Sequence, residues 1–209
     1  MSWKTRAERP HTDRVGGGQR ADVEQALLII DLQNAVFDGK QIPPAYAAER
    51  LLDNAGALLE AARRSRVPII HVQHCAAAGE ALEEGGPGWP IYAPVAPDAG
   101  EPVVRKRFAS AFEATELHAV LQKLGVGSLI VTGIQSEHCV AATCRAALEL
   151  GYSVCLAEDA HSTWPTGDRS AEEIVAEQNH TLNAGGVALR HTEDLIRAIR
   201  GGRAADGGA

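Results

Sequence analysis

The chain has 209 residues, 45% of them hydrophobic and 22% charged, which is the composition of an ordinary globular protein and a suitable length for one α/β domain with a full core. Its net charge of −7 argues against a protein that wraps nucleic acid or sits on an anionic membrane, and no apolar run approaches the roughly 20 residues that cross a bilayer. No apolar stretch of the signal-peptide kind precedes Ala26. We therefore expect a cytoplasmic protein without nucleic-acid or membrane partners, whose four cysteines are reduced.

Short apolar runs alternate with helical patterns between two ends that lack both period and bulk. We expect mobile tails at 1–22 and 201–209, and one domain over 23–200. In chain order, strands are predicted at 26–30, 67–72, 102–105, 128–132, 152–157 and 186–189, and helices at 51–62, 115–124, 138–150, 171–182 and 192–199. Residues 75–100 are rich in Gly, Pro and Ala without a period, so they predict a long loop of the kind that is usually functional.

Near-continuous apolar strands that alternate with helices are typical of an α/β protein whose parallel sheet is covered on both faces. In such sheets, ligands bind at the carboxyl ends of the strands. Asp31 follows the first predicted strand, Lys106 the third and Cys139 the fourth. Other chemically capable residues also follow strands, namely His74, Cys75, Asp159 and His161. We expect these side chains to gather at one edge of the sheet.

Cys139 lies where a strand, a tight turn and a helical pattern follow one another. The free N–H groups and the dipole of a helix N-terminus favour thiolate over thiol, and the thiolate is the nucleophilic form. Many cysteines are simply small buried apolar residues, so position alone leaves an inert thiol open.

Asp31 and Lys106 would complete a reactive set with Cys139. A carboxylate can take the thiol proton and later return it to a leaving group, and a nearby ammonium favours both anions. The turn before Cys139 can direct backbone N–H groups at a developing oxyanion. Together these groups suffice for covalent hydrolysis through an acyl-enzyme. The alternatives are a strand-end cap for Asp31 and a solvated surface position for Lys106.

Three blocks of the sequence resemble the signature blocks of the isochorismatase-like cysteine hydrolases. They are residues 28–34 (LIIDLQN), 106–117 (KRFASAFEATEL) and 133–143 (GIQSEHCVAAT). Their order and spacing fit that family, and the likeness covers residues 25–199. The resemblance implies a three-layer α/β/α fold with a mostly parallel six-stranded sheet. It also implies a homo-oligomer, as a dimer or larger.

The same resemblance implies a role for each residue of the set. Cys139 would be the nucleophile, Asp31 the general base and acid, and Lys106 the third member of the triad. The peptide bond between Ile134 and Gln135 would be cis, and the backbone N–H groups of Gln135 and Cys139 would form the oxyanion hole.

The retained cysteine indicates the type of reaction within the family. Members that cleave the vinyl ether of isochorismate lack it, so its presence points to hydrolysis of a C–N bond in an amide, lactam, imide or ureido group. A finer pattern over 133–139, 158–164 and 179–182 is similar to the sub-branch that includes streptothricin hydrolase, whose substrate is a cationic lactam. Biuret or ureidoacrylate hydrolysis, a catalytically silent member and a redox-sensing thiol are the alternatives.

A metal or other cofactor is not expected. Nicotinamidase-like members of the family hold a metal with an Asp-x-His pair and a further His after the second strand. Here that region contains only His71 and His74, which would point to opposite faces of a strand.

Aromatic and polar residues near the signature blocks are the candidates for contact with substrate. For each of them, core packing or a loop anchor is the alternative. The candidates are Gln33, Phe37, His74, Trp89, Phe108, Phe112, Glu137, His161 and Trp164.

Overall fold

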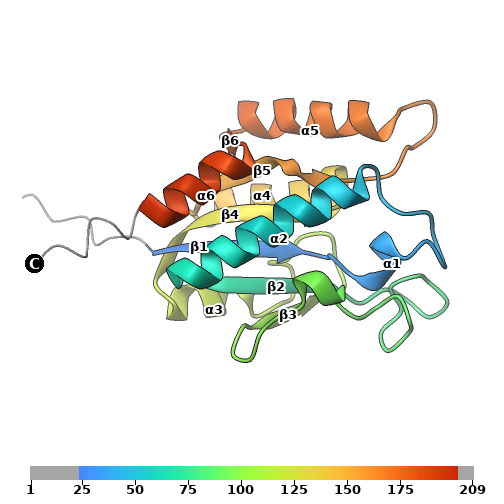
Figure 1. The fold of residues 1–209 in the computed structure, drawn as a ribbon, viewed down its shortest axis with the longest axis horizontal. Helices are drawn as coiled ribbons and strands as arrows, with labels where there is room; N and C mark the ends of the chain where they lie inside the picture. The colour runs from blue at the N-terminus through green and yellow to red at the C-terminus, as the bar shows by residue number, and fades with distance from the viewer. Residues whose placement is uncertain (1–23, 202–209) are drawn as a thin grey trace, which may run out of the picture.

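The computed structural model describes residues 24–201, which form one sheet covered by helices on both faces (Figure 1). Every pair of neighbouring strands is parallel, and the order across the sheet is β3-β2-β1-β4-β5-β6. The strands are β1 Glu24–Ile30, β2 Ile69–His74, β3 Val103–Lys106, β4 Val126–Ile134, β5 Ser153–Ser162 and β6 Ala188–Arg190. The predicted three-layer fold with a six-stranded sheet is confirmed.

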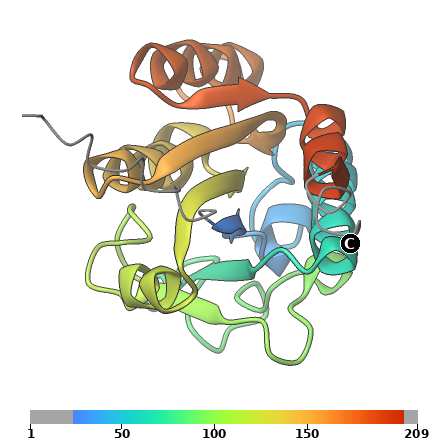
Figure 2. The same cartoon turned by 90° about the vertical axis from the view of Figure 1, so that its left-hand side faces the viewer.

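Two groups of helices form the outer layers. α2 and α6 pack together on one face, whereas α3, α4 and α5 cover the other (Figure 2). The helices are α1 Asn34–Phe37, α2 Ala48–Ser65, α3 Leu117–Lys123, α4 Ala141–Glu149, α5 Ala171–Ala184 and α6 Thr192–Gly201. No helix in this part of the chain is long and apolar enough to cross a membrane.

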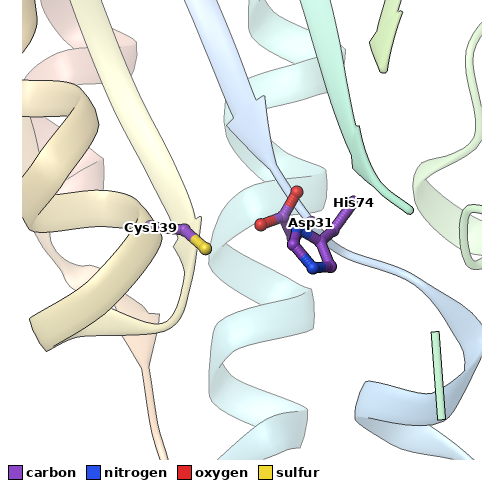
Figure 3. A group of neighbouring side chains, drawn as sticks. All are labelled: Asp31, His74 and Cys139. Carbon is purple, nitrogen blue, oxygen red and sulfur yellow. The ribbon is translucent and has the colours of Figure 1, made fainter. Parts of the chain in front are cut away.

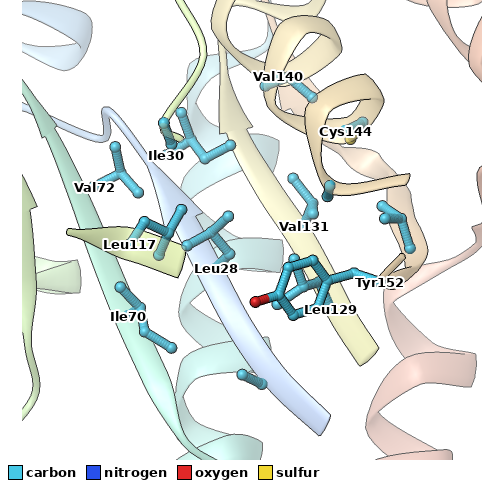
Figure 4. Close-up of a cluster of buried hydrophobic side chains, with 14 of the residues drawn as sticks. Leu28, Ile30, Ile70, Val72, Leu117, Leu129, Val131, Val140, Cys144 and Tyr152 are labelled. Carbon is cyan, nitrogen blue, oxygen red and sulfur yellow. The ribbon is translucent and has the colours of Figure 1, made fainter. Parts of the chain in front are cut away.

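β1 shows why the strands are apolar along their whole length. Leu28 and Ile30 belong to the core cluster beneath α3 and α4 (Figure 4), while Leu27 and Ile29 belong to the cluster beneath α2 and α6. Successive side chains of a strand point to opposite faces, so a strand buried on both faces needs apolar residues at every position.

β5 and the 75–100 segment differ from the sequence-based expectation, and the short helix α1 was not predicted. β5 runs to Ser162, so Asp159 and His161 lie within the strand and do not follow it. Residues 75–100 contain a 3-10 helix at Ala93–Val95, and this segment folds back so that Ile91 pairs with Gln33. The predicted tails fall outside the described residues, except that Gly201 is the last residue of α6.

The strand order reverses between β1 and β4, and the two strands approach closely there. Gly133 has a φ of +130°, and a Cβ at this position would lie 2.1 Å from the carbonyl oxygen of Ile30. Only glycine fits such a position. Ligands of open α/β sheets bind at this kind of switch point, outside the carboxyl ends of the strands. The close approach brings the end of β1, and with it Asp31, beside the turn that carries Cys139.

Leu28→Ala is expected to lower the free energy of unfolding by about 2–5 kcal/mol, because Leu28 is fully buried and its removal leaves a cavity. Leu150→Ala is the matched control, since Leu150 is 46% exposed and its loss should change stability by no more than about 0.5 kcal/mol. Urea denaturation measures both values. Equal stabilities for the two variants would contradict this account of the core.

Candidate active site

The Lys106 ammonium lies at the centre of a cluster at the carboxyl edge of the sheet. Its Nζ is 2.8 Å from Oδ2 of Asp31, 3.0 Å from Sγ of Cys139 and 3.1 Å from Nδ1 of His74. The Lys106 side chain is 0% exposed. An ammonium withdrawn from water is tolerated only when it is paired and hydrogen-bonded, so the Asp31 carboxylate is its counter-ion.

Local backbone geometry brings these groups together. Lys106 ends β3 and pairs in register with His74, which ends β2. Asp31 has a φ of +55°, a left-handed conformation that aspartate tolerates better than most residues. Its N–H donates to the carbonyl of Val72, 3.0 Å away, which holds this turn against β2. Three neighbouring strand ends therefore supply the cluster from one side.

Cys139 comes from a wide turn on the other side of the cluster. The peptide bond between Ile134 and Gln135 is cis, the geometry that the resemblance implied. Residues Ser136–Val140 then form a π-helical turn, and α4 starts only at Ala141. The predicted helix from 138 therefore begins as a wider turn, with Cys139 near its end.

A buried hydrogen-bond network supports the turn that carries Cys139. His161 lies with Nδ1 2.8 Å from the hydroxyl of Ser136 and Nε2 2.9 Å from Oδ1 of Asn179. Asn179 donates through Nδ2 to the carbonyl of Glu158, which fixes its amide orientation. Nε2–H of His161 therefore donates to Asn179, and Nδ1 accepts from Ser136. Burial lowers the pKa of His161, in keeping with this neutral tautomer.

The environment of Cys139 favours the thiol. Burial and the Asp31 carboxylate raise the pKa of Cys139 to about 11, and the Lys106 ammonium only partly opposes them. Desolvation and the neighbouring Asp31 carboxylate therefore oppose the thiolate that the start of a helix favours.

Asp31 is placed to accept the thiol proton. Burial raises the pKa of Asp31 despite the Lys106 ammonium, and Oδ1 of Asp31 is buried without a hydrogen-bond partner among the described residues. The Cys139 sulfur points toward this carboxylate (Figure 3), and Sγ lies within 4.8 Å of a carboxylate oxygen. Burial disfavours the charged form of Lys106, but attraction to Asp31 and Cys139 outweighs it and raises the pKa of Lys106. The ammonium therefore stays charged whichever of the two groups, Asp31 or Cys139, holds the proton.

The same cluster contains a group of potential metal ligands. Asp31, His74 and Cys139 present ligand atoms within 4.8 Å of one another. The Lys106 ammonium already lies within 3.1 Å of a polar atom of each. A divalent cation among them would face that positive charge, so the set does not fit a metal ion while Lys106 is protonated.

A cavity of about 250 Å³ opens beside Cys139 and Asp31. Of the nine residues predicted to contact substrate, His74 and Trp164 line it. Burial and the Lys106 ammonium lower the pKa of His74, so this imidazole is neutral and accepts from Lys106 through Nδ1. The remaining lining residues are Val36, Ile42, Ala76, Glu80, Ala81, Leu82, Ile134 and Gln135.

The predicted aromatic contacts lie elsewhere. Phe37 stacks on Tyr92 with ring centroids 4.5 Å apart, and Phe112 stacks on Tyr152 at 5.8 Å. Phe108 is 49% exposed and lines a separate hollow. These three rings therefore pack on other rings or face solvent, and none of them lines the cavity beside Cys139.

Trp89 is used in contacts within the protein: its indole N–H donates to Sγ of Cys75, 3.4 Å away, and Arg105 lies over its ring. It supports the 75–100 segment and does not line the cavity beside Cys139.

The polar candidates for contact with substrate also make hydrogen bonds within the protein. The Gln33 amide donates to the carbonyls of His74 and Trp89, which ties the end of β2 and the 75–100 segment to the start of α1. Glu137 accepts from the hydroxyl of Thr163 at 2.8 Å. His161 holds the Cys139 turn, as described above. These three side chains fix the walls of the site and do not line its cavity.

Some lining residues were not among the nine candidates for contact with substrate. Glu80, Ala81 and Leu82 belong to the 75–100 segment, whose length and composition had predicted a functional loop. Ile42 lies in an exposed Ile-Pro-Pro stretch, which carries no signal of a site.

Comparison with known proteins agrees with the fold. A family model described as isochorismatase domain matches residues 25–194. The chain is 44% identical to a streptothricin hydrolase of Streptomyces noursei over 140 residues, which are 67% of this chain and 50% of that relative. It is 29% identical to maleamate amidohydrolase of Pseudomonas putida over 177 residues, which are 76% of this chain and 78% of that protein. It therefore spans about half the length of the streptothricin hydrolases that it matches.

A solved structure supports the same fold. The isochorismatase of Pseudomonas putida KT2440 superposes with a TM-score of 0.77 at 32% identity, over 82% of this chain and 89% of that one.

Alkylation of Cys139 by iodoacetamide at pH 7 is expected to be slower than alkylation of N-acetylcysteine, because the raised pKa leaves little thiolate. The rate should increase with pH and level off only near the pKa of about 11. Peptide mass spectrometry follows Cys139 separately from the other thiols. Faster alkylation of Cys139 than of N-acetylcysteine at pH 7 would show that the resting residue is a thiolate.

Proposed function

Because this chain belongs to the isochorismatase family, we propose that it is a cysteine-dependent amidohydrolase that cleaves a C–N bond through an acyl-enzyme on Cys139. One observation carries the proposal: a single buried ammonium lies 2.8 Å from the Asp31 carboxylate and 3.0 Å from the Cys139 sulfur. Asp31 and Cys139 can exchange a proton while the net charge of the three groups stays zero.

Acylation would begin with that proton transfer. As Sγ of Cys139 attacks the carbonyl carbon, Asp31 takes the thiol proton and negative charge develops on the carbonyl oxygen. The backbone N–H groups of Gln135 and Cys139 would stabilise this oxyanion. Asp31 then gives the proton to the leaving nitrogen, the C–N bond breaks, and a thioester remains on Cys139.

Deacylation would use the same groups with water as the nucleophile. Asp31 removes a proton from the water as its oxygen attacks the thioester carbonyl, and the same backbone N–H groups hold the oxyanion. The C–S bond breaks, and the thiolate recovers its proton from Asp31. The products are a carboxylic acid and the amine or ammonia released earlier.

Lys106 would act on both steps without exchanging a proton. The negative charge moves between Asp31 and Cys139, and the ammonium is adjacent to both. In a buried site, a fixed positive charge of this kind stabilises a developing thiolate far more than it would in water.

The relatives supply the candidates for the substrate. Similarity to streptothricin hydrolase supports a lactam, and similarity to maleamate amidohydrolase supports a small amide. Streptothricin lactam is our leading candidate, with biuret and ureidoacrylate as alternatives. A redox-sensing role is less well supported, because the raised pKa of Cys139 leaves little of the thiolate that peroxide attacks. We also propose a cytoplasmic, cofactor-independent homo-oligomer, as a dimer or larger.

Cys139→Ala is expected to lower turnover of any cleaved amide by at least about 10⁴-fold, because the acyl-enzyme cannot form. Cys155→Ala is the matched control, since Cys155 lies on β5, outside the cavity and the Lys106 cluster, and should keep wild-type turnover. The assay is release of amine from streptothricin, biuret, ureidoacrylate, nicotinamide and simple lactams.

Circular dichroism verifies that both variants are folded. Residual turnover by Cys139→Ala within tenfold of wild type would overturn the assignment of the nucleophile.

A further inference from the structure

A second hollow, of about 720 Å³, adjoins the cavity beside Cys139. The two share Ile42, Gln135 and Trp164 as walls. We call the second hollow the proline groove, because Pro43, Pro44 and Pro165 line it. A substrate whose carbonyl lies at Cys139 could therefore extend past Trp164 into the groove.

The proline groove presents an uncharged surface. Among the described residues that line it, none is Asp, Glu, Lys or Arg. The indole N–H of Trp164 is used by the carbonyl of Pro43, 2.7 Å away, which leaves the ring as apolar wall. The hydroxyl of Ser170 is bonded to Glu173 in the capping box of α5. The remaining lining residues are Tyr46 and Ala171.

The walls of the groove are tied to one another. The N–H of Tyr46 donates to the carbonyl of Thr163 at 2.9 Å, and the hydroxyl of Ser162 donates to the carbonyl of Tyr46. Together with the bond from Trp164 to Pro43, these contacts fix the 43–46 segment against the end of β5. Because the groove is already formed, a ligand that binds there loses little affinity to ordering of the protein.

Charge lies on the other side of the catalytic cavity. Glu80 lines that cavity, whereas Glu83 accepts from the N–H of Gly79, and Glu84 pairs with Arg105 and Arg107. Glu80 is therefore the acidic residue of this loop that lines the cavity. A cationic group placed in the groove would lose water and meet no carboxylate among the described residues that line it.

From these contacts we infer that the proline groove is a subsite for an uncharged apolar ring attached to the scissile amide. The attachment rests on the proposed function, whereas the preference for a neutral ring rests on the groove itself. Flat walls from Trp164, Tyr46 and three prolines suit an aromatic or alicyclic ring.

Binding to Cys139→Ala protein tests the inference without any turnover. Calorimetry compares acetamide, phenylacetamide and 4-(aminomethyl)phenylacetamide, the last of which carries an ammonium on the same ring. Phenylacetamide is expected to bind at least about tenfold more tightly than acetamide, because the ring is removed from water. It should also bind at least about tenfold more tightly than its cationic analogue.

A charge placed in the groove should reverse that preference. In Cys139→Ala protein, Pro165→Glu is expected to shift the ratio of the two aromatic affinities at least about tenfold toward the cation. Pro94→Glu is the matched control: Pro94 is an exposed proline that lines neither hollow, and the ratio should stay as in Cys139→Ala alone. A ratio within one preparation does not depend on the fraction of folded protein.

Equal binding of the neutral and cationic rings to Cys139→Ala, or equal ratios in the two glutamate variants, would overturn the inference. Hydrolysis is measured separately with wild-type protein. If phenylacetamide binds with the expected preference and no amide is cleaved, the proposed function fails and the subsite stands. If amides are cleaved without a preference for the neutral ring, the subsite fails and the proposed function stands.

Discussion

The buried ion pair between Lys106 and Asp31 is the interaction on which the active edge of this molecule depends. A lysine with no exposed side-chain surface needs a compensating anion, and removing one partner of such a pair costs about 3–5 kcal/mol. The partner lies at the end of β1, the lysine at the end of β3, and Cys139 beyond the end of β4. The strand order β3-β2-β1-β4 brings these three residues together, so the electrostatics of the site depend on the topology of the sheet. His74, which ends the intervening strand β2, supplies a further acceptor to the same ammonium.

Much of this arrangement was predictable because it depends on local patterns and on a general rule for parallel sheets. Six apolar runs marked the six strands, since a strand buried on both faces is apolar throughout. The rule that ligands bind at carboxyl strand ends then selected seven residues, of which Asp31, His74, Lys106 and Cys139 lie in one cluster. β5 was predicted too short because Glu158, Asp159 and His161 break its apolar pattern. The Asp159 carboxylate has partners within the protein, since it accepts from the backbone N–H and hydroxyl of Thr192, at the start of α6.

The walls of the site were not predictable, because they arise from contacts between distant segments. Aromatic residues near the signature blocks were candidates for contact with substrate. Phe37 and Phe112 stack on other rings and do not line the cavity. Ile42 and Trp164 meet only because the 43–46 segment is bonded to the end of β5. The protonation state of Cys139 has the same origin. Its place before a helix favoured thiolate, but its burial and its distance to Asp31 exist only in the folded chain, and they favour the thiol.

The central claim is that the Lys106 ammonium stabilises negative charge on either Asp31 or Cys139. Its most direct test is a thiolate titration by ultraviolet absorbance in wild-type and Lys106→Met protein, with Cys139→Ala as the blank for each. Cys139 should titrate near pH 11 in the wild type and at higher pH in Lys106→Met, because the site loses its only adjacent cation among the described residues. Circular dichroism of the variant establishes that it is folded over the range compared. An unchanged or lower midpoint in folded Lys106→Met would contradict the claim.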